Sequence, residues 1–166
     1  MRSILVVTLL VLAGCKSTPE TTADPKPTAD ASASPVTTAE VLPLVQLKRG
    51  ACFGRCPMYS VTVFTDGAVS FDGERFVETQ GHATGKLDAA ALGKLVKRLE
   101  SSGFAEWKPS YENRQVTDMA TVTLTFRGRT IVHYIGDESA PAGLKQLEDD
   151  VDALIGTSQW IAGALQ

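Results

Sequence analysis

Alternating hydrophobic and polar residues predict antiparallel strands over residues 57–80. Tyr59 begins a stretch in which apolar residues recur at every second position, the pattern of a strand that buries one face. Asp66-Gly67 and Asp72-Gly73 are turn sequences that divide this region. We therefore expect a three-stranded meander, with its third strand beginning at Phe76.

Two later segments carry the periodicity of amphipathic helices. The first is expected to begin at Asp88, an N-cap residue type, and to have Gly103 at its C′ position. The second is expected to have Pro141 in its first turn and to end at Gly156. Their predicted apolar faces are Leu92, Leu95, Val96 and Leu99 in the first helix, and Leu144, Leu147, Val151, Leu154 and Ile155 in the second.

A second hairpin is predicted between the two helices. Threonines alternate with apolar residues over residues 121–126, and Arg127-Gly128-Arg129 provides a turn before an apolar segment at residues 131–135. The predicted order is β-β-β-α-β-β-α. We therefore expect an α+β fold, in which an antiparallel sheet of about five strands carries two helices packed on one face. The expected aromatic anchors of the core or its edge are Trp107, Tyr111 and Trp160.

Residues 1–14 predict a signal peptide. Arg2 precedes an apolar run at residues 4–12, which is too short for a membrane-spanning helix of about 20 residues. The run leads into Leu12-Ala13-Gly14-Cys15, which resembles the lipobox of bacterial lipoproteins. This resemblance implies cleavage before Cys15 and diacylglycerol on its sulfur. Lys16 then favours transport to the outer membrane, because an aspartate at that position is the retention signal.

Residues 15–40 are expected to be the lipid-bearing Cys15 followed by a disordered tether. The segment is rich in Thr, Pro, Ala and Ser and contains no aromatic residue, so it cannot bury enough apolar surface to fold. A single domain is expected over residues 41–166. Such a protein would be lipid-anchored in the bacterial envelope, in the outer membrane and facing the periplasm.

Composition argues against several functional classes. The chain has 16 Lys and Arg against 19 Asp and Glu, a net charge of −3, whereas a nucleic-acid-binding protein needs a basic surface. Two His and three Cys are too few for a zinc-ribbon protein. We therefore expect no nucleic-acid partner, no cofactor and no metal.

The most informative stretch is residues 49–59, RGACFGRCPMY. Here the chain resembles the bacterial DUF6438 family, whose pattern is R-x-x-C-x-G-x-C-P-x-Y, then a D-G turn and a later T-D before a strand. The resemblance covers residues 44–161 and implies an extracytoplasmic domain, often lipid-anchored, with no assigned activity. The positions that match are Arg49, Cys52, Gly54, Cys56, Pro57, Tyr59, Asp66, Gly67, Thr117 and Asp118.

The cysteine pair most simply forms a disulfide. A chain that follows a signal peptide reaches an oxidising compartment, where Cys52 and Cys56 would be bridged. Gly54 between them permits the tight loop that bridging requires. So small a ring contributes only about 2 kcal/mol in the chain-entropy treatment. Its expected role is therefore to fix a local shape before the first predicted strand.

A reactive thiol pair is the alternative interpretation. C-x-x-x-C-P also occurs in copper-delivering proteins of the thioredoxin type, so Cys52 and Cys56 could handle electrons or copper. Thioredoxin-like chemistry, however, places its first cysteine at a helix N-terminus, whereas a strand pattern follows the motif here. The residues that could complete a copper site are Met58, His82 and His133.

The other polar residues have structural interpretations. Thr117-Asp118 is expected to make a side-chain to backbone turn, His133 to be a hydrogen-bonded or exposed strand residue, and His82 to lie in a flexible loop. A solvated helix face is expected for Glu148, Asp149, Asp150 and Asp152.

No nucleophile–base pair or phosphate-binding glycine loop is recognisable, so we expect a protein that is not an enzyme. The function expected by elimination is a binding or interaction module tethered to a membrane. Its partners would be that membrane, through the lipid anchor, and an unidentified envelope protein. A further hypothesis is an enzyme inhibitor that presents the loop from Cys52 to Cys56.

Overall fold

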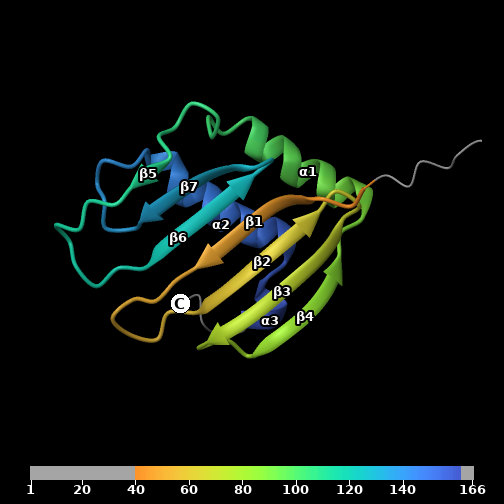
Figure 1. Cartoon of the computed structure of the whole chain (residues 1–166), viewed down its shortest axis with the longest axis horizontal. Coiled ribbons are helices and arrows are strands. Elements are labelled where there is room, and N and C mark those ends of the chain that lie inside the picture. Colours follow the sequence, from red (N-terminus) through yellow and green to blue (C-terminus); the bar gives the residue numbers. More distant parts are fainter. Residues whose placement is uncertain (1–39, 162–166) are drawn as a thin grey trace, which may run out of the picture. The chain divides into compact units, whose positions relative to one another are not determined.

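A seven-stranded mixed sheet forms the centre of the molecule, with the strand order β4-β3-β2-β1-β6-β7-β5 (Figure 1). The computed structural model describes residues 40–161; the expected signal peptide, Cys15 and nearly all of the expected tether lie outside the described residues. All neighbouring strands are antiparallel except β5 and β7, which are parallel. The strands are β1 Pro43–Arg49, β2 Met58–Phe64, β3 Ala68–Arg75, β4 Gly81–Lys86, β5 Ser110–Tyr111, β6 Thr121–Phe126 and β7 Arg129–Tyr134.

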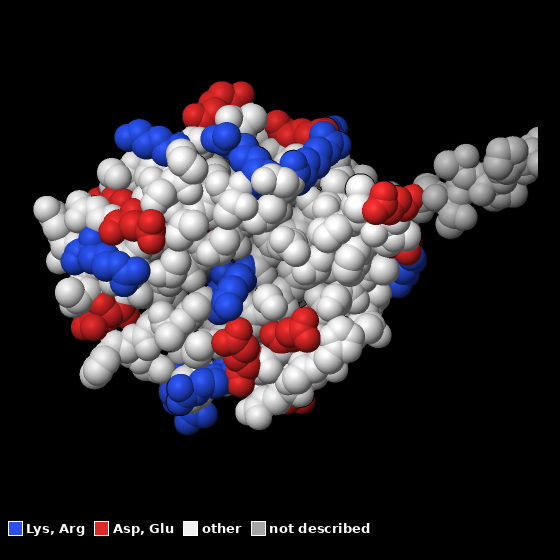
Figure 2. Space-filling model, in the orientation of Figure 1, with Lys and Arg blue, Asp and Glu red and all other residues white. Residues whose placement is uncertain are grey.

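Two main helices, α1 (Ala89–Glu100) and α2 (Ala142–Ile155), pack against this sheet, and a short α3 (Ser158–Ile161) follows. In the central strands every second residue is buried, so the helices cover one face and the other is open to solvent. Figure 2 shows few charged side chains over the middle of this open face. The expected α+β fold is therefore confirmed, with more strands than the sequence suggested.

An apolar core lies between the sheet and the helices, and a few polar and charged side chains of β1, β7 and α2 are buried beside it. Phe71 stacks on Trp160 with ring centroids 4.9 Å apart, so the end of the described chain closes over β3. Tyr111 and Trp160 are buried, and Trp107 packs against the core from its margin, as expected. Among the described residues, the buried core extends from Val45 to Ile161.

The helix boundaries agree with the sequence at three of four ends. Asp88 caps α1 by accepting a hydrogen bond from the Ala91 backbone N–H at 2.7 Å, and Gly156 ends α2 in the left-handed conformation. Pro141 immediately precedes α2. The expectation for Gly103 was wrong, because α1 already ends at Glu100 and the Ser101 backbone N–H bonds to the last carbonyls.

The strands along the chain differ from the prediction at β1, at β5, which was not predicted, and at the turn between β3 and β4. β1 was not predicted, although it is the central strand between β2 and β6. β3 continues through Asp72-Gly73, where a turn was expected, and the chain turns at residues 76–80 instead. Gly73 is required for close packing, since a Cβ there would lie 2.0 Å from the Thr79 carbonyl oxygen. His82 therefore lies in strand β4 and not in a loop.

The strand directions give the sheet two unlike ends. The turn end holds residue 40, where the described chain begins, and the short turns Asp66-Gly67 and Arg127-Gly128. The loop end holds the connections at residues 50–57, 76–80, 112–120 and 135–141. β1 runs from the turn end to the loop end, so the two ends are separated by the length of the strands (Figure 1).

Candidate functional site

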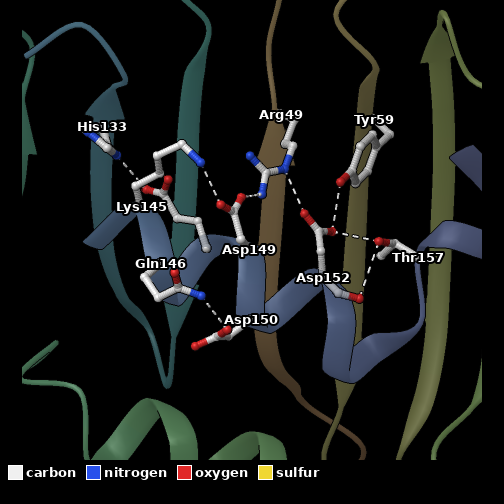
Figure 3. Close-up of polar contacts among 10 residues, drawn as sticks. Arg49, Tyr59, His133, Lys145, Gln146, Asp149, Asp150, Asp152 and Thr157 are labelled. Atoms are coloured by element: carbon white, nitrogen blue, oxygen red, sulfur yellow. Dashed lines mark hydrogen bonds and ion pairs between the residues drawn. The ribbon is translucent and has the colours of Figure 1, made fainter. Parts of the chain in front are cut away.

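Arg49 and Tyr59, the first and last residues of the motif, meet at one carboxylate of α2. They are direct partners in the β1–β2 register, and both side chains lie on the face that α2 covers. The Arg49 Nε–H donates to Asp152 Oδ2 at 2.7 Å, and the Tyr59 hydroxyl donates to Asp152 Oδ1 at 2.8 Å (Figure 3). Thr157 also donates to Asp152 Oδ1, at 2.9 Å. The motif thus ties the β1–β2 hairpin to the second helix.

This junction is buried and charged. Arg49 is 9% exposed and Asp152 is 3% exposed. Burial acts to lower the pKa of the Arg49 guanidinium, but the carboxylates of Asp152 and Asp149 outweigh it, so the net shift is upward and Arg49 stays charged. Burial, together with Asp152, also raises the pKa of Tyr59, which remains a neutral hydrogen-bond donor.

The acidic run of α2 is therefore not the solvated face expected from the sequence. Glu148 and Asp152 are buried, while Asp149 and Asp150 are partly exposed. Asp149 accepts hydrogen bonds from Arg49 at 2.9 Å and from Lys145 at 2.6 Å. Leu144, Glu148 and Asp152 are spaced by four residues, so both buried acids lie on the apolar stripe of the helix. That spacing is the sequence signal that could have revealed them.

His133 and Glu148 form a second buried pair beside this junction. Their Nδ1 and Oε1 atoms are 2.8 Å apart, and the residues are 3% and 1% exposed. The expected hydrogen-bonded strand histidine is confirmed. Burial raises the pKa of Glu148, although the hydrogen bond from His133 opposes that shift. Glu148 Oε2 has no hydrogen-bond partner among the residues described.

The middle of the motif is a disulfide-closed loop between β1 and β2. Cys52 and Cys56 are bridged, with Cα atoms 5.8 Å apart, as the sequence predicts. Gly54 has a φ of 153°, a conformation that other residues rarely adopt. Phe53 is 86% exposed and projects from this ring. The loop therefore presents a large aromatic side chain to solvent.

The T-D element of the family pattern supports the same loop. The Phe53 backbone N–H donates to the Asp118 carbonyl oxygen at 3.0 Å, and the Gly50 N–H donates to the Thr121 carbonyl oxygen at 2.8 Å. Thr117 hydrogen-bonds the Asp118 carboxylate; the side-chain to backbone bond expected for this pair does not occur among the described residues. Asp118 has a positive φ of 69°. Residues 112–120 thus buttress the disulfide loop.

Asp66-Gly67, the remaining element of the pattern, lies at the turn end of the sheet. The Asp66 carboxylate accepts a hydrogen bond from the Ala68 backbone N–H at 2.9 Å, which with Lys86 holds its pKa below the usual range. A Cβ at position 67 would lie 2.6 Å from the Leu87 carbonyl oxygen, so only glycine fits. The predicted turn is confirmed, and its position gives it a structural role.

The histidines proposed as copper ligands are each bonded to a carboxylate. His82 Nδ1 is 3.1 Å from Asp72 Oδ1 on the exposed face of the sheet, and His133 is beneath α2. Within residues 40–161, no three His, Cys, Asp or Glu side chains gather closely enough to hold a metal ion.

A shallow hollow at the loop end is framed by residues 112–120 and 135–141. Asp137 joins these segments by accepting hydrogen bonds from the Asn113 and Ser139 backbone N–H groups, each at 2.9 Å, and from the Ser139 hydroxyl. These bonds with Ser139 and Asn113 hold the pKa of Asp137 below its usual range. The residues that line the hollow are Asn113, Gln115, Val116, Gly136, Glu138 and Ser139.

The fold and the motif contacts define an α+β domain built on a disulfide-closed hairpin that is anchored to a helix by a buried carboxylate. The chain belongs to the family described as a domain of unknown function, DUF6438, whose model matches residues 43–155. The match includes both cysteines and the Arg49–Tyr59–Asp152 junction. A search of the curated proteins found no match. None of the helices described is long and apolar enough to cross a membrane.

Proposed function

We propose that this chain is an envelope lipoprotein whose DUF6438 domain is a non-catalytic binding module. The observation that carries the proposal is the contrast within the motif: Phe53 is 86% exposed on a covalently closed loop, while Arg49 and Asp152 are buried and bonded to each other. Charged groups that are buried and paired in this way serve the fold, and the exposed aromatic is free to contact a partner.

The loop end has the features of a binding surface. Of the large apolar residues that are exposed, Phe53, Val116 and Met119 lie in the loops of this end. The disulfide and the bond to Asp118 already order the Phe53 backbone, so little conformational entropy is lost when it binds. Exposed aromatics on rigid loops are typical binding hot spots.

The envelope location is supported by the sequence. Lipid on Cys15 would anchor the chain, and residues 16–40 would connect that anchor to β1. β1 begins at the turn end of the sheet, so the loop end lies on the side of the domain away from the tether attachment. A coil of about 25 residues spans roughly 25–30 Å in root-mean-square length, so a tether of the kind expected from the sequence would keep the domain near the membrane.

Sedimentation with a bacterial envelope fraction tests this function. The chain from residue 16 to residue 166, which lacks the lipidation site, should sediment with the envelope fraction, and Phe53→Ser should reduce the bound fraction about tenfold. Leu42→Ser is the matched control, because it removes an exposed apolar residue at the turn end. Equal binding by the two variants would contradict the proposal, as would steady turnover of a substrate by the purified domain.

The second candidate is a thiol–disulfide or copper-handling protein that uses Cys52 and Cys56. It is favoured by one observation: both cysteines are partly exposed, beside Arg55, whose charge would stabilise a thiolate. Catalysis of insulin reduction, lost in Cys52→Ser, would establish this function. Absence of catalysis by a protein shown to be fully reduced would exclude a thiol–disulfide oxidoreductase, but would not test copper handling.

A further inference from the structure

Phe76 adopts a backbone conformation that is rare for an aromatic residue. It lies in the β3–β4 turn at the loop end, and its φ is 55°. Positive φ is costly for bulky side chains and persists only where the surrounding structure imposes it. Two arginines stack on its ring: the guanidinium carbons of Arg55 and Arg75 are 5.7 Å and 5.2 Å from the centroid.

These two arginines lack acidic partners. Neither Arg55 nor Arg75 has a carboxylate within 4.0 Å or a side-chain hydrogen bond in the part of the chain that the structure describes. Arg127 provides the comparison at the turn end: its guanidinium carbon is 4.9 Å from the Phe126 centroid, but it is also bonded to Glu100 at 2.8 Å. The loop end therefore holds two arginines that share one aromatic ring, Arg55 and Arg75, and a third, Arg114, whose guanidinium carbon is 4.6 Å from the Tyr134 centroid. None of the three has a carboxylate within 4.0 Å among the residues described.

A guanidinium that stacks on a ring keeps its N–H groups free at the rim. Those groups match the oxygens of a phosphate, to which arginine donates paired hydrogen bonds. Neither nearby acid is paired with these arginines: Glu74 is bonded to Lys48 at 3.5 Å, and Glu78, in the same turn, forms no ion pair with Arg55 or Arg75 among the described residues. The two arginines thus present cationic hydrogen-bond donors that no described carboxylate pairs with.

Phe53 supplies the apolar part of the same surface. It stands two residues before Arg55 on the closed loop and is 86% exposed. An aromatic side chain that projects from the surface beside cations is suited to a membrane interface, where anionic headgroups lie above the hydrocarbon. The hollow at the loop end is lined by other residues and does not include Phe53.

We infer that the loop end binds the surface of a membrane that contains anionic phospholipid. Arg55 and Arg75 bond the lipid phosphates, and Phe53 enters the boundary with the acyl chains. This inference rests on the proposed function, because it names the partner of that binding surface. Each arginine contributes about fivefold to membrane partitioning, as expected for one basic residue near an anionic surface. Such weak binding becomes effective when a lipid anchor holds the domain close by.

Vesicle sedimentation tests the inference with the chain from residue 16 to residue 166, which retains the whole core. One set of vesicles contains phosphatidylcholine alone, and the other contains equal parts of phosphatidylcholine and phosphatidylglycerol. We expect binding only to the second set, at low salt. Arg55→Gln/Arg75→Gln should weaken it about twentyfold and Phe53→Ser about tenfold. Arg127→Gln is the matched control, since it removes a ring-stacked arginine from the opposite end, and it should change binding less than twofold.

Several results would overturn the inference. Equal loss in Arg127→Gln would indicate general charge attraction, and equal binding to both vesicle sets would exclude phosphate recognition. Inorganic phosphate that binds the isolated domain and displaces it from vesicles at the same concentration would indicate a site for the free anion. Loss of envelope binding after protease treatment, with no binding to vesicles, would indicate a protein partner; the proposed binding function would then stand while the lipid inference failed.

Discussion

The two ends of the R-x-x-C-x-G-x-C-P-x-Y motif and its middle occupy opposite physical environments. Arg49 and Tyr59 are buried and share the Asp152 carboxylate, whereas Phe53 between them is 86% exposed. The sequence pattern is continuous, but the ends secure the hairpin to α2 and the middle is held out into solvent. Substitutions at the two ends of the motif should therefore change the stability of the fold, and substitutions in its middle should change binding.

The largest expected effect is on the free energy of unfolding, and it is expected at Arg49, one of the buried ends of the motif. Arg49→Met should lower the free energy of unfolding by about 3–5 kcal/mol, because it leaves the Asp152 carboxylate buried without its cation. Lys48→Met is the matched control: Lys48 precedes Arg49, points to the open face and is 59% exposed, so its loss should cost less than about 0.5 kcal/mol. Urea unfolding measures both. Similar losses in the two variants would refute the structural role of the motif's ends.

An intermediate effect is expected for the disulfide. Cys52→Ser/Cys56→Ser should lower the free energy of unfolding by about 2 kcal/mol, since the closed ring is short and constrains the unfolded chain little. Reduction of the unmutated domain should give the same loss in urea unfolding. If the reduced domain were unfolded without urea, the disulfide loop would be a principal determinant of the fold. The distinction between stabilising ends and an exposed middle of the motif would then be wrong.

A pH-dependent effect is expected beneath α2. Burial raises the pKa of Glu148 above its ordinary value of 4.5, so the folded state favours the protonated acid. Its contribution to stability is full below that ordinary value and is lost as the pH rises through the raised pKa. Glu148→Gln, which imitates the protonated acid, should therefore gain stability relative to the unmutated chain as the pH rises above 4.5.

Unfolding measured at a series of pH values checks this prediction. Glu138→Gln is the control, because Glu138 is exposed in the loop before α2 and its variant should differ from the unmutated chain by a constant amount. A constant difference for Glu148→Gln as well would show that the buried pair does not titrate with folding.

The smallest effect on stability is expected at the exposed middle. Phe53→Ser should change the free energy of unfolding by less than about 0.5 kcal/mol, since the ring contacts solvent, while it reduces binding about tenfold. Thermal unfolding and envelope sedimentation of the same preparation separate the two properties. A Phe53 variant that lost both stability and binding would show that Phe53 contributes to the fold, contrary to the distinction between the ends and the middle of the motif.

Local pattern predicts much of this fold. β2, β6 and both main helices follow from residue periodicity, and the helix limits at Asp88 and Gly156 follow from capping preferences. β1 could not be assigned in this way, because its stability comes from partners on both sides that are distant in sequence, β2 and β6. Asp72-Gly73 misled the prediction, since Gly73 serves close packing within a strand and not a turn.

The candidate site was predicted in part. The disulfide follows from the spacing of the cysteines and the expected compartment, and Arg49 and Tyr59 were marked by the family pattern. The partner of both, Asp152, was assigned to a solvated face, because an acidic run on a helix usually is one. Its burial depends on a cation that β1 places beneath the helix, which is a tertiary contact that local pattern does not contain.

The reduction potential of the Cys52–Cys56 bridge decides whether the middle of the motif is a fixed binding element or a reaction centre. It is measured by equilibrating the purified domain with dithiol buffers and determining the alkylated fraction by mass. We expect a potential below about −300 mV, as in structural disulfides. A potential between about −120 and −270 mV, the range of dithiol oxidoreductases, would contradict it and identify the loop as a redox site.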